Sequence, residues 1–289
     1  MSKTQRGEIA LFSAAILYGL FGVFSKVINF QIPIFYQSWI RNILSILILA
    51  ILVLFLKKWK KVTPLDNIWI MFRGVSGFIS FIAMYIAFTK LDIGTTYFLS
   101  YAATVIAGYV LGVLVFKEAL TKKGIVALVL SLAGLLFVYN VTFSVQTLPF
   151  ILLAIVSGIA APGWNAFSKM ISSKYSNFQL NLFDSVYAFI FPFVVSLGVH
   201  ETWVPITLTP VWGYTFLFGM MFMATGFLIV YGFSKVSAQA GILILLFEII
   251  AGIIFGYIFF HETLAIGEII GGVCILGAIV LRSSDPESI

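Results

Sequence analysis

The chain has 289 residues, of which 61% are apolar, 17% aromatic and only 10% charged. Soluble globular proteins contain about 45–50% apolar and about 25% charged residues, so this chain has too few charged side chains to cover a surface exposed to water. Its 17 Lys and Arg against 11 Asp and Glu give a net charge of +6, which in a membrane protein is first tested as loop charge. The composition excludes a soluble domain and indicates that lipid is the main solvent.

The sequence contains ten apolar runs, separated by charged, proline-containing or polar clusters. A spanning helix needs about 20 apolar residues, whereas the strands of a membrane barrel alternate apolar with polar residues. We therefore predict an all-α integral membrane fold with ten transmembrane helices. The predicted spans are residues 9–28, 34–56, 68–88, 93–116, 124–140, 148–168, 179–199, 212–233, 238–260 and 266–281.

Basic residues are distributed unequally between the two sides of the predicted membrane. Lys26 and Lys90 fall on the side opposite the N-terminus. Because cytoplasmic loops carry an excess of Lys and Arg, we expect a multi-pass protein of the cell inner (plasma) membrane with both termini in the cytoplasm. The basic residues on the N-terminal side are Lys3, Arg6, Lys57, Lys58, Lys60, Lys61, Lys117, Lys122, Lys123, Lys169, Lys174, Lys235 and Arg282.

The chain also contains an internal repeat. Residues 106–120 align without gaps with residues 250–264, and seven of the fifteen aligned positions are identical, including Glu118 with Glu262. Each of these two acids follows a predicted helix, and we expect both to stabilise the helix turn that comes next. Two further matches, at offsets of 143 and 145 residues, are 24–26 with 167–169 and 88–90 with 233–235.

The repeat divides the chain into two units of five helices, residues 1–143 and 144–289. Because five is an odd number, the second unit enters the membrane from the opposite side, and the repeat is inverted. Inverted repeats are typical of secondary transporters, in which one unit rocks against the other around a site near the middle of the bilayer. The sequence therefore predicts a transporter that works by alternating access.

The order and symmetry of several short motifs resemble the drug/metabolite transporter (DMT) superfamily, in particular its EamA-type ten-helix members. The chain departs from the family pattern at Ile249, where Pro is common. The resemblance implies a central cavity lined mainly by the first, third, fourth, sixth, eighth and ninth helices. The motifs are Tyr18-Gly19 with Lys26, Arg73-Gly74, Phe116-Lys117-Glu118, Phe247-Glu248 and Phe260-His261-Glu262.

Glu248 is the most informative single residue, because it lies about ten residues into the apolar run 238–260 and so near the middle of the membrane. A charged residue at the centre of a spanning helix costs about 2.5–3.5 kcal/mol on insertion scales, so it normally faces a cavity or a partner. Glu248 can act as the counter-charge for a substrate ammonium group, or it can carry a coupling proton. The alternative is a structural role, in which the carboxyl group joins two helices by a hydrogen bond.

Arg73 and Asp184 each lie about five residues in from the N-terminal-side ends of their spans. This common depth predicts an ion pair that ties or gates that side, and snorkelling of both side chains to the interface is the alternative. Arg41 is related to Asp184 by the offset of 143 residues. Because inversion places these two residues in opposite leaflets, a direct salt bridge between them is not expected.

Residues 162–165, Pro-Gly-Trp-Asn, interrupt the apolar run 148–168, and the matching segment of the first helix is the Gly-rich 19–22. Pro removes a backbone hydrogen bond, so we expect a bend or partial break there, and paired breaks mark the binding sites of transporters. Packing in the core or against lipid is the alternative role for each aromatic residue here. The predicted substrate-binding residues are Glu248, Trp164, Asn165, Tyr18 and Tyr101.

Enzyme motifs are absent from the sequence. The two histidines, His200 and His261, lie at predicted outer boundaries, and there is no His-Glu-x-x-His, no Gly-x-Ser-x-Gly and no phosphate-binding loop. The single Cys274 excludes an intramolecular disulfide and a multi-cysteine metal site. We therefore expect no catalytic residue, no metal, no cofactor and no nucleic-acid partner.

The predicted partners are the lipid bilayer and a small organic metabolite. A central acid with aromatic walls favours a cation or zwitterion, such as an amino-acid-like or nucleoside-like molecule. The alternative function is an integral membrane enzyme acting on lipid or prenyl substrates, which would gather several His, Asp or Ser groups near one interface. The sequence leaves open a coupling proton or counter-substrate, the direction of transport and the oligomeric state.

Overall fold

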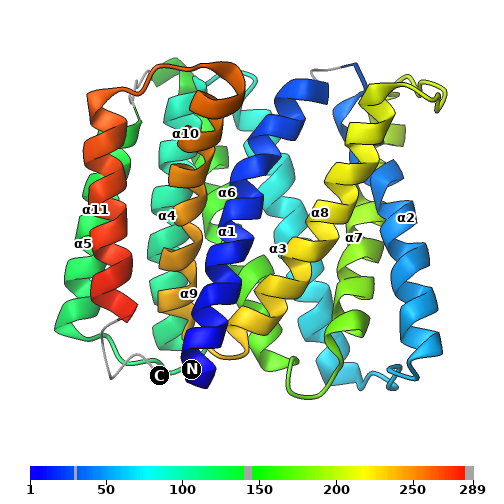
Figure 1. The fold of residues 1–289 in the computed structure, drawn as a ribbon, viewed down its shortest axis with the longest axis horizontal. Coiled ribbons are helices and arrows are strands. Elements are labelled where there is room, and N and C mark those ends of the chain that lie inside the picture. The colour runs from blue at the N-terminus through cyan, green and yellow to red at the C-terminus, as the bar shows by residue number, and fades with distance from the viewer. Residues whose placement is uncertain (29–30, 140–144, 284–289) are drawn as a thin grey trace.

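The computed structural model describes residues 1–28, 31–139 and 145–283, and its regular elements are all helices. They run side by side between the two ends of the molecule (Figure 1). The elements are α1 (Lys3–Ile28), α2 (Ile34–Phe55), α3 (Pro64–Ala87), α4 (Ile93–Leu114), α5 (Lys122–Val138), α6 (Leu148–Ala166), α7 (Asn177–Gly198), α8 (Pro210–Phe233), α9 (Ala238–Leu245), α10 (Phe247–Phe260) and α11 (Ile266–Ser283), with 3₁₀ turns η1 (Val145–Thr147) and η2 (Phe167–Met170).

Each predicted span corresponds to one helix or to a joined pair. Within the described residues, nine spans are long and apolar enough to cross a membrane, where α6 with η2 and α9 with α10 each count once. The tenth is α5, which has 17 residues and is the shortest. The prediction of an all-α membrane protein with ten transmembrane helices is confirmed.

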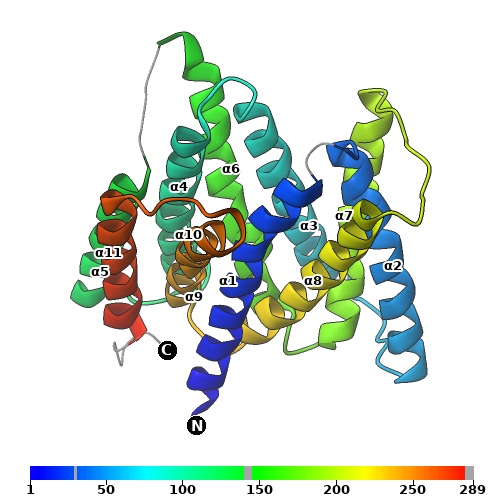
Figure 2. The same cartoon turned by 45° about the horizontal axis from the view of Figure 1, so that its top comes forward.

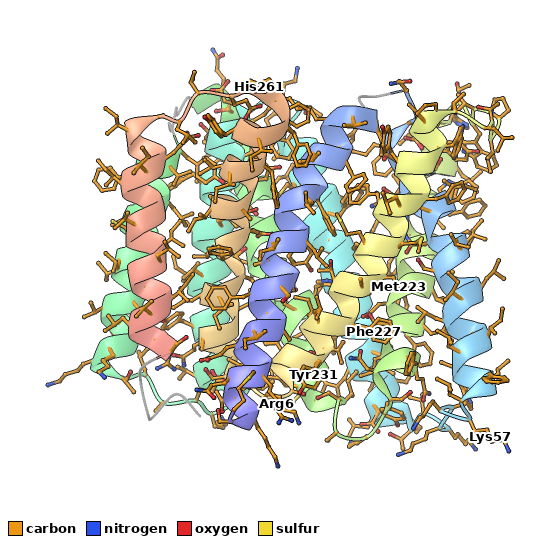
Figure 3. All side chains as sticks on the ribbon, viewed as in Figure 1. Arg6, Lys57, Met223, Phe227, Tyr231 and His261 are labelled. Atoms are coloured by element: carbon orange, nitrogen blue, oxygen red, sulfur yellow. The ribbon has the colours of Figure 1, made fainter. Side chains whose placement is uncertain are left out.

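The two ends of the molecule differ in charge. α1 begins and α11 ends at one end, which we call the N-terminal face, and the opposite end is the distal face (Figures 1 and 2). Figure 3 shows Arg6 and Lys57 at the N-terminal face and His261 at the distal face. Between them, outward-pointing side chains of α8 include Phe227 and Tyr231 (Figure 3), as expected for a surface in contact with lipid.

The packing of the helices repeats between the two units. α1 packs against α8 and α10, and its counterpart α6 packs against α3 and α4. α2 packs against α7, and α5 packs against α11, so each of these helices meets its own counterpart. Such pairing is the pattern expected when a two-fold axis relates the units, and it agrees with the predicted inverted repeat.

The ends of four helices repeat in the same way. Lys57 and His200 follow α2 and α7, and Lys117 and His261 follow α4 and α10. All four have a left-handed backbone, with φ between 51° and 57°. Positive φ is uncommon for residues other than Gly, so its recurrence at offsets of 143 and 144 residues indicates that both units share one backbone plan.

The break in a helix lies elsewhere than predicted. We predicted a bend or partial break at residues 162–165, and the structure has no break there: α6 continues as an α-helix through Pro162 to Ala166 and only then tightens into η2. The neighbouring helices α3 and α4 pack along α6 and hold it in a helical course despite the missing backbone hydrogen bond.

The ninth span is interrupted instead, at Leu246 between α9 and α10. The amide of Leu246 donates to the carbonyl of Leu243, and the amide of Ile249 donates to the carbonyl of Leu246, both at 3.0 Å. These bonds span three residues, as in a 3₁₀ turn. All eight residues of α9 are buried, so packing on every side stabilises the break. The residue at the break is Leu246, and neither Pro nor Gly marks it in the sequence.

Candidate functional site

A cavity of about 380 Å³ lies between the two five-helix units. Its wall is formed by side chains from α1 to α4 of the first unit and from α6 to α10 of the second. α2 and α7 contribute to its wall in addition to the helices that the family resemblance implied. A mainly apolar cavity of this size with a few polar groups is the usual form of a small-molecule site.

The structure brings the five predicted substrate-binding residues together on the wall of this cavity. Tyr18 comes from α1, Tyr101 from α4, Trp164 and Asn165 from α6, and Glu248 from α10. Their convergence from four helices follows from the contacts of α1 with α10 and of α6 with α4. A wall location is the geometry that a binding role requires, and the role itself remains a proposal.

Glu248 stands directly after the break in the ninth span, in the first turn of α10. Its side chain is only partly buried, because it faces the cavity. The first turn of a helix has backbone N–H groups without intrahelical acceptors, and the helix dipole there favours a negative charge. The break therefore places the carboxyl group in the first turn of a helix, although it lies in the interior of a span.

Three tyrosines form a stack beside this carboxyl group. The ring centroids of Tyr97 and Tyr101 are 5.7 Å apart, and those of Tyr101 and Tyr139 are 6.3 Å apart. The Tyr101 hydroxyl is the neighbour of the Glu248 carboxyl group in the cavity wall. Tyr97 lies one helical turn before Tyr101, so helical spacing alone could have predicted that pair, whereas Tyr139 is brought in by α5.

Trp164 is seated against a glycine of the facing helix. A Cβ atom added at Gly77 of α3 would lie 2.5 Å from the Trp164 ring, so no larger residue fits there without displacing the indole. The centre of the ring lies 5.0 Å from the guanidinium carbon of Arg73, one turn before Gly77 on the same helix. The indole thus separates the cavity from the charged group below it, toward the N-terminal face.

Arg73 and Asp184 form a bidentate ion pair. Arg73 Nε lies 2.8 Å from Asp184 Oδ1, and Arg73 Nη2 lies 2.8 Å from Oδ2. Only 1% of Arg73 and 4% of Asp184 are exposed, so neither side chain snorkels to the interface. A further N–H of Arg73 donates to the carbonyl of Asn165 at 3.5 Å. The pair joins α3 of the first unit to α7 of the second.

Lysines and glutamates make two equivalent cross-unit ion pairs. Lys169 Nζ lies 3.2 Å from Glu118 Oε1 at the N-terminal face, and Lys26 pairs with Glu262 at the distal face. The lysines and the glutamates are both matched by the repeat. The position of the two glutamates at opposite faces is what an inverted repeat requires.

We expected Glu118 to stabilise the helix that follows it. Instead it binds the start of a helix in the other unit. Its carboxylate accepts hydrogen bonds from the amides of Ala238 and Gln239, at 2.5 and 3.0 Å, in the first turn of α9. The principle of a carboxylate at a helix N-terminus therefore holds, but the helix is supplied by tertiary packing.

The cavity lies nearer the distal face. Ser38 of α2 and Met84 of α3, both close to that face, line the cavity. Their repeat counterparts near the N-terminal face, Asn181 and Ile229, have exposed fractions of only 2% and 1% and are not part of its lining. Packing between the units fills the equivalent space on the N-terminal side.

Arg41 of α2 also lines the cavity, a position that the sequence reasoning did not assign to it. Its depth in the membrane was evident from the sequence, and a charge at that depth normally faces a cavity or a partner. The direction in which the side chain points depends on how α2 packs against α7 and α8, which the sequence alone does not fix.

Comparisons with known proteins agree with this architecture. Residues 5–140 and residues 148–284 each match the model of a family described as the EamA-like transporter family. No curated protein matches the chain. A solved structure titled only "Crystal structure of protein" has a TM-score of 0.77 and 12% sequence identity, with 95% of each chain covered. At that identity the similarity shows the fold alone.

The two family matches fall on the two five-helix units, one match to each, and together they cover nearly the whole chain. The family that matches both units is a family of transporters. The chain belongs to the EamA-like transporter family, a group of multi-pass membrane proteins in the drug/metabolite transporter superfamily.

Proposed function

We propose that this protein is a secondary transporter that moves a small organic metabolite across the cytoplasmic membrane by alternating access. The observation that carries the proposal is a cavity between two inverted units with a carboxyl group, Glu248, and aromatic rings on its wall. The carboxyl group suits a positively charged nitrogen of the substrate, and the rings suit an apolar or aromatic body. An amino-acid-like or nucleoside-like solute fits both.

Alternating access requires that one side of the site be closed while the other is accessible. The position of the cavity toward the distal face supports a state that admits substrate from that side. The buried Arg73–Asp184 pair lies on the opposite side and joins the two units, so we assign it the role of the N-terminal-side gate. Opening that side requires these two side chains to separate.

The N-terminal face is the cytoplasmic side in this proposal. Thirteen of the basic residues, Lys3 to Arg282, belong to that side and two belong to the other, which follows the positive-inside rule. Single cysteines at Lys58 and at Thr207, in a Cys274→Ser background, provide the test. We expect a membrane-impermeant thiol reagent added to intact cells to label Thr207→Cys, and labelling of Lys58→Cys instead would reverse the orientation.

The transport function is tested with purified protein and a metabolite library. We expect a subset of amino-acid-like or nucleoside-like compounds to raise the melting temperature, and we expect liposomes that contain the protein to accumulate those compounds faster than protein-free liposomes. Exchange and proton coupling are separated by preloading the liposomes with the same compound or by imposing a pH gradient. Absence of protein-dependent uptake for every stabilising compound contradicts the proposal.

A further inference from the structure

Arg41 is a positively charged group in the cavity, and no carboxylate of a described residue forms an ion pair with it. Its guanidinium carbon lies 4.0 Å from the ring centroid of Phe218 and 6.0 Å from that of Phe222. Its Nε atom is buried and makes no hydrogen bond with any described residue. A stacked aromatic ring stabilises a guanidinium by about 0.5–2 kcal/mol, but it accepts none of the in-plane hydrogen bonds that the group offers.

The inverted repeat shows which group is missing beside Arg41. Asp184 is the counterpart of Arg41 at the offset of 143 residues, and Phe218 is the counterpart of Arg73 at the offset of 145 that also relates Gly74 to Gly219. On the N-terminal side the matched positions therefore hold a bidentate Arg–carboxylate pair. On the distal side they hold a guanidinium and an aromatic ring. A carboxylate that entered the cavity would complete the second pair.

The backbone fixes the place of Arg41 closely. A Cβ atom added at Gly219 of α8 would lie 2.9 Å from the Arg41 carbonyl oxygen and 3.0 Å from its Cβ. α2 and α8 therefore approach each other at this residue as closely as a glycine allows. From this contact the Arg41 side chain lines the cavity, with its guanidinium over Phe218 of the same helix α8.

Other donors of α2 in the cavity wall are already used. Ser38 Oγ donates to the carbonyl of Ile34 at 2.7 Å. Asn42 Nδ2 donates to the carbonyls of Ser38 and Ala188, at 2.7 and 3.4 Å. Since an amide nitrogen has two hydrogens, Asn42 has none left for a ligand. The guanidinium is therefore the group of this helix that can bind an anion in the cavity.

We propose that Arg41 is the carboxylate-binding residue of the cavity, so that the substrate carries a carboxylate group in addition to a positively charged nitrogen. The inference rests on the proposed transport function and narrows its substrate class to amino-acid-like molecules. Arg41 is on α2 and Glu248 is on α10, which lie on opposite sides of α1 (Figures 1 and 2). The carboxylate of the substrate then lies at the α2 side of the cavity, with the body of the substrate against Tyr18 and Trp164.

The charges of the cavity favour a carboxylate over a phosphate. Arg41 and Glu248 are the two charged residues among those that line it, and with both ionised their formal charges cancel. A zwitterion leaves this sum at zero, whereas a phosphate dianion adds negative charge close to a carboxylate in a poorly hydrated space. The planar guanidinium also matches the two oxygens of a carboxylate.

The test uses matched probes and the full chain in nanodiscs. The probes are phenylalanine, phenylalanine amide, which lacks the carboxylate, and inorganic phosphate, and the readouts are melting temperature and tryptophan fluorescence. We expect phenylalanine to bind, and we expect its amide and the Arg41→Gln variant each to show affinity reduced roughly tenfold to hundredfold, the loss expected for a charge-assisted hydrogen-bonded pair. Arg41→Lys should recover part of it, and Arg6→Gln, at the exposed N-terminal face, should bind as wild type does.

Several results overturn the inference. They are equal binding of phenylalanine and its amide, wild-type affinity in Arg41→Gln, binding of phosphate in preference to phenylalanine, and no binding of phenylalanine. A folding defect is excluded by the melting temperature without ligand, which we expect to be unchanged in Arg41→Gln. If the protein instead transports a solute without a carboxylate, the transport function stands and the role of Arg41 fails. If no solute is transported, the transport function fails separately.

Discussion

The two faces of this transporter share a backbone plan but differ in the side chains that join the units. Within the described residues, three ion pairs link the units at the N-terminal face, namely Arg73–Asp184, Lys169–Glu118 and Lys174–Asp66. One ion pair, Lys26–Glu262, links them at the distal face. An inverted repeat thus supplies two equivalent frameworks, and the side chains on them make more ion pairs between the units at the N-terminal face than at the distal face.

The matched Lys–Glu pairs illustrate the same difference. The side chains of Lys169 and Glu118 are 22% and 12% exposed, whereas those of Lys26 and Glu262 are both 54% exposed. Exposed ion pairs contribute about 0–1 kcal/mol, because water screens them and ordering two long side chains costs entropy. The two matched Lys–Glu pairs therefore contribute differently to the stability of the contact between the units at the two faces.

The largest effect is expected when the buried ion pair is broken. Asp184→Asn leaves the Arg73 guanidinium buried without a counter-charge, and such a loss costs about 3–5 kcal/mol of unfolding free energy. Unfolding of the purified protein in detergent, followed by tryptophan fluorescence, measures the change. The comparison is Arg41→Gln on the distal side, which removes a charge that has no carboxylate partner among the described residues and should have little effect. Equal destabilisation by the two variants would contradict the asymmetry.

A smaller loss of stability is expected when a side chain is added at Gly77, against which the Trp164 ring packs. In Gly77→Ala the new Cβ lies 2.5 Å from the indole, and overpacking of this kind costs about 1–3 kcal/mol. Because the displaced ring is part of the cavity wall, we also expect slower uptake. Gly213→Ala is the control, since nothing lies within 4 Å of its added Cβ and both substitutions gain the same helix propensity. Full activity and stability in Gly77→Ala would contradict the assignment of Trp164 to the transport site.

The smallest effect is the difference in stability loss between variants of the two matched glutamates, Glu118 and Glu262. Glu118→Gln weakens two backbone hydrogen bonds and an ion pair, and we expect a loss of about 1–3 kcal/mol, as for hydrogen bonds to a charged group. Glu262→Gln affects an exposed pair and should cost less than about 1 kcal/mol. Thermal unfolding of both variants in the same detergent makes the comparison, and a larger loss for Glu262→Gln would reverse the order of strength assigned to the two faces.

The fold follows from local features of the sequence. Apolar runs of spanning length predict the helices, and the match between residues 106–120 and 250–264 predicts the inverted arrangement. The depth of Glu248 in its span also indicates a cavity residue, since an unpartnered charge in lipid is too costly to face outward. The similar depth of Arg73 and Asp184 in their spans likewise indicates that the two side chains can form an ion pair.

The missed features depend on contacts between distant segments. Leu246 has no sequence signal for a helix break, and the break is sustained by the complete burial of α9. The binding of Glu118 to the start of α9 requires the two units to be in place. Arg41 was correctly excluded from a bridge with Asp184, but its exposure to the cavity depends on the Gly219 contact. Sequence periodicity predicts each helix but not the rotation with which it docks.

The most direct test of the account is uptake by the Glu248→Gln variant in liposomes across a range of pH, with a substrate found by the thermal-shift screen. The substitution keeps the shape of the side chain and removes its charge, so folding should be nearly intact. We expect uptake to fall or to lose its dependence on pH, while the control Glu268→Gln, on α11 away from the cavity lining, transports as wild type does. Wild-type uptake by Glu248→Gln at every pH would contradict the assignment of Glu248 to the transport site.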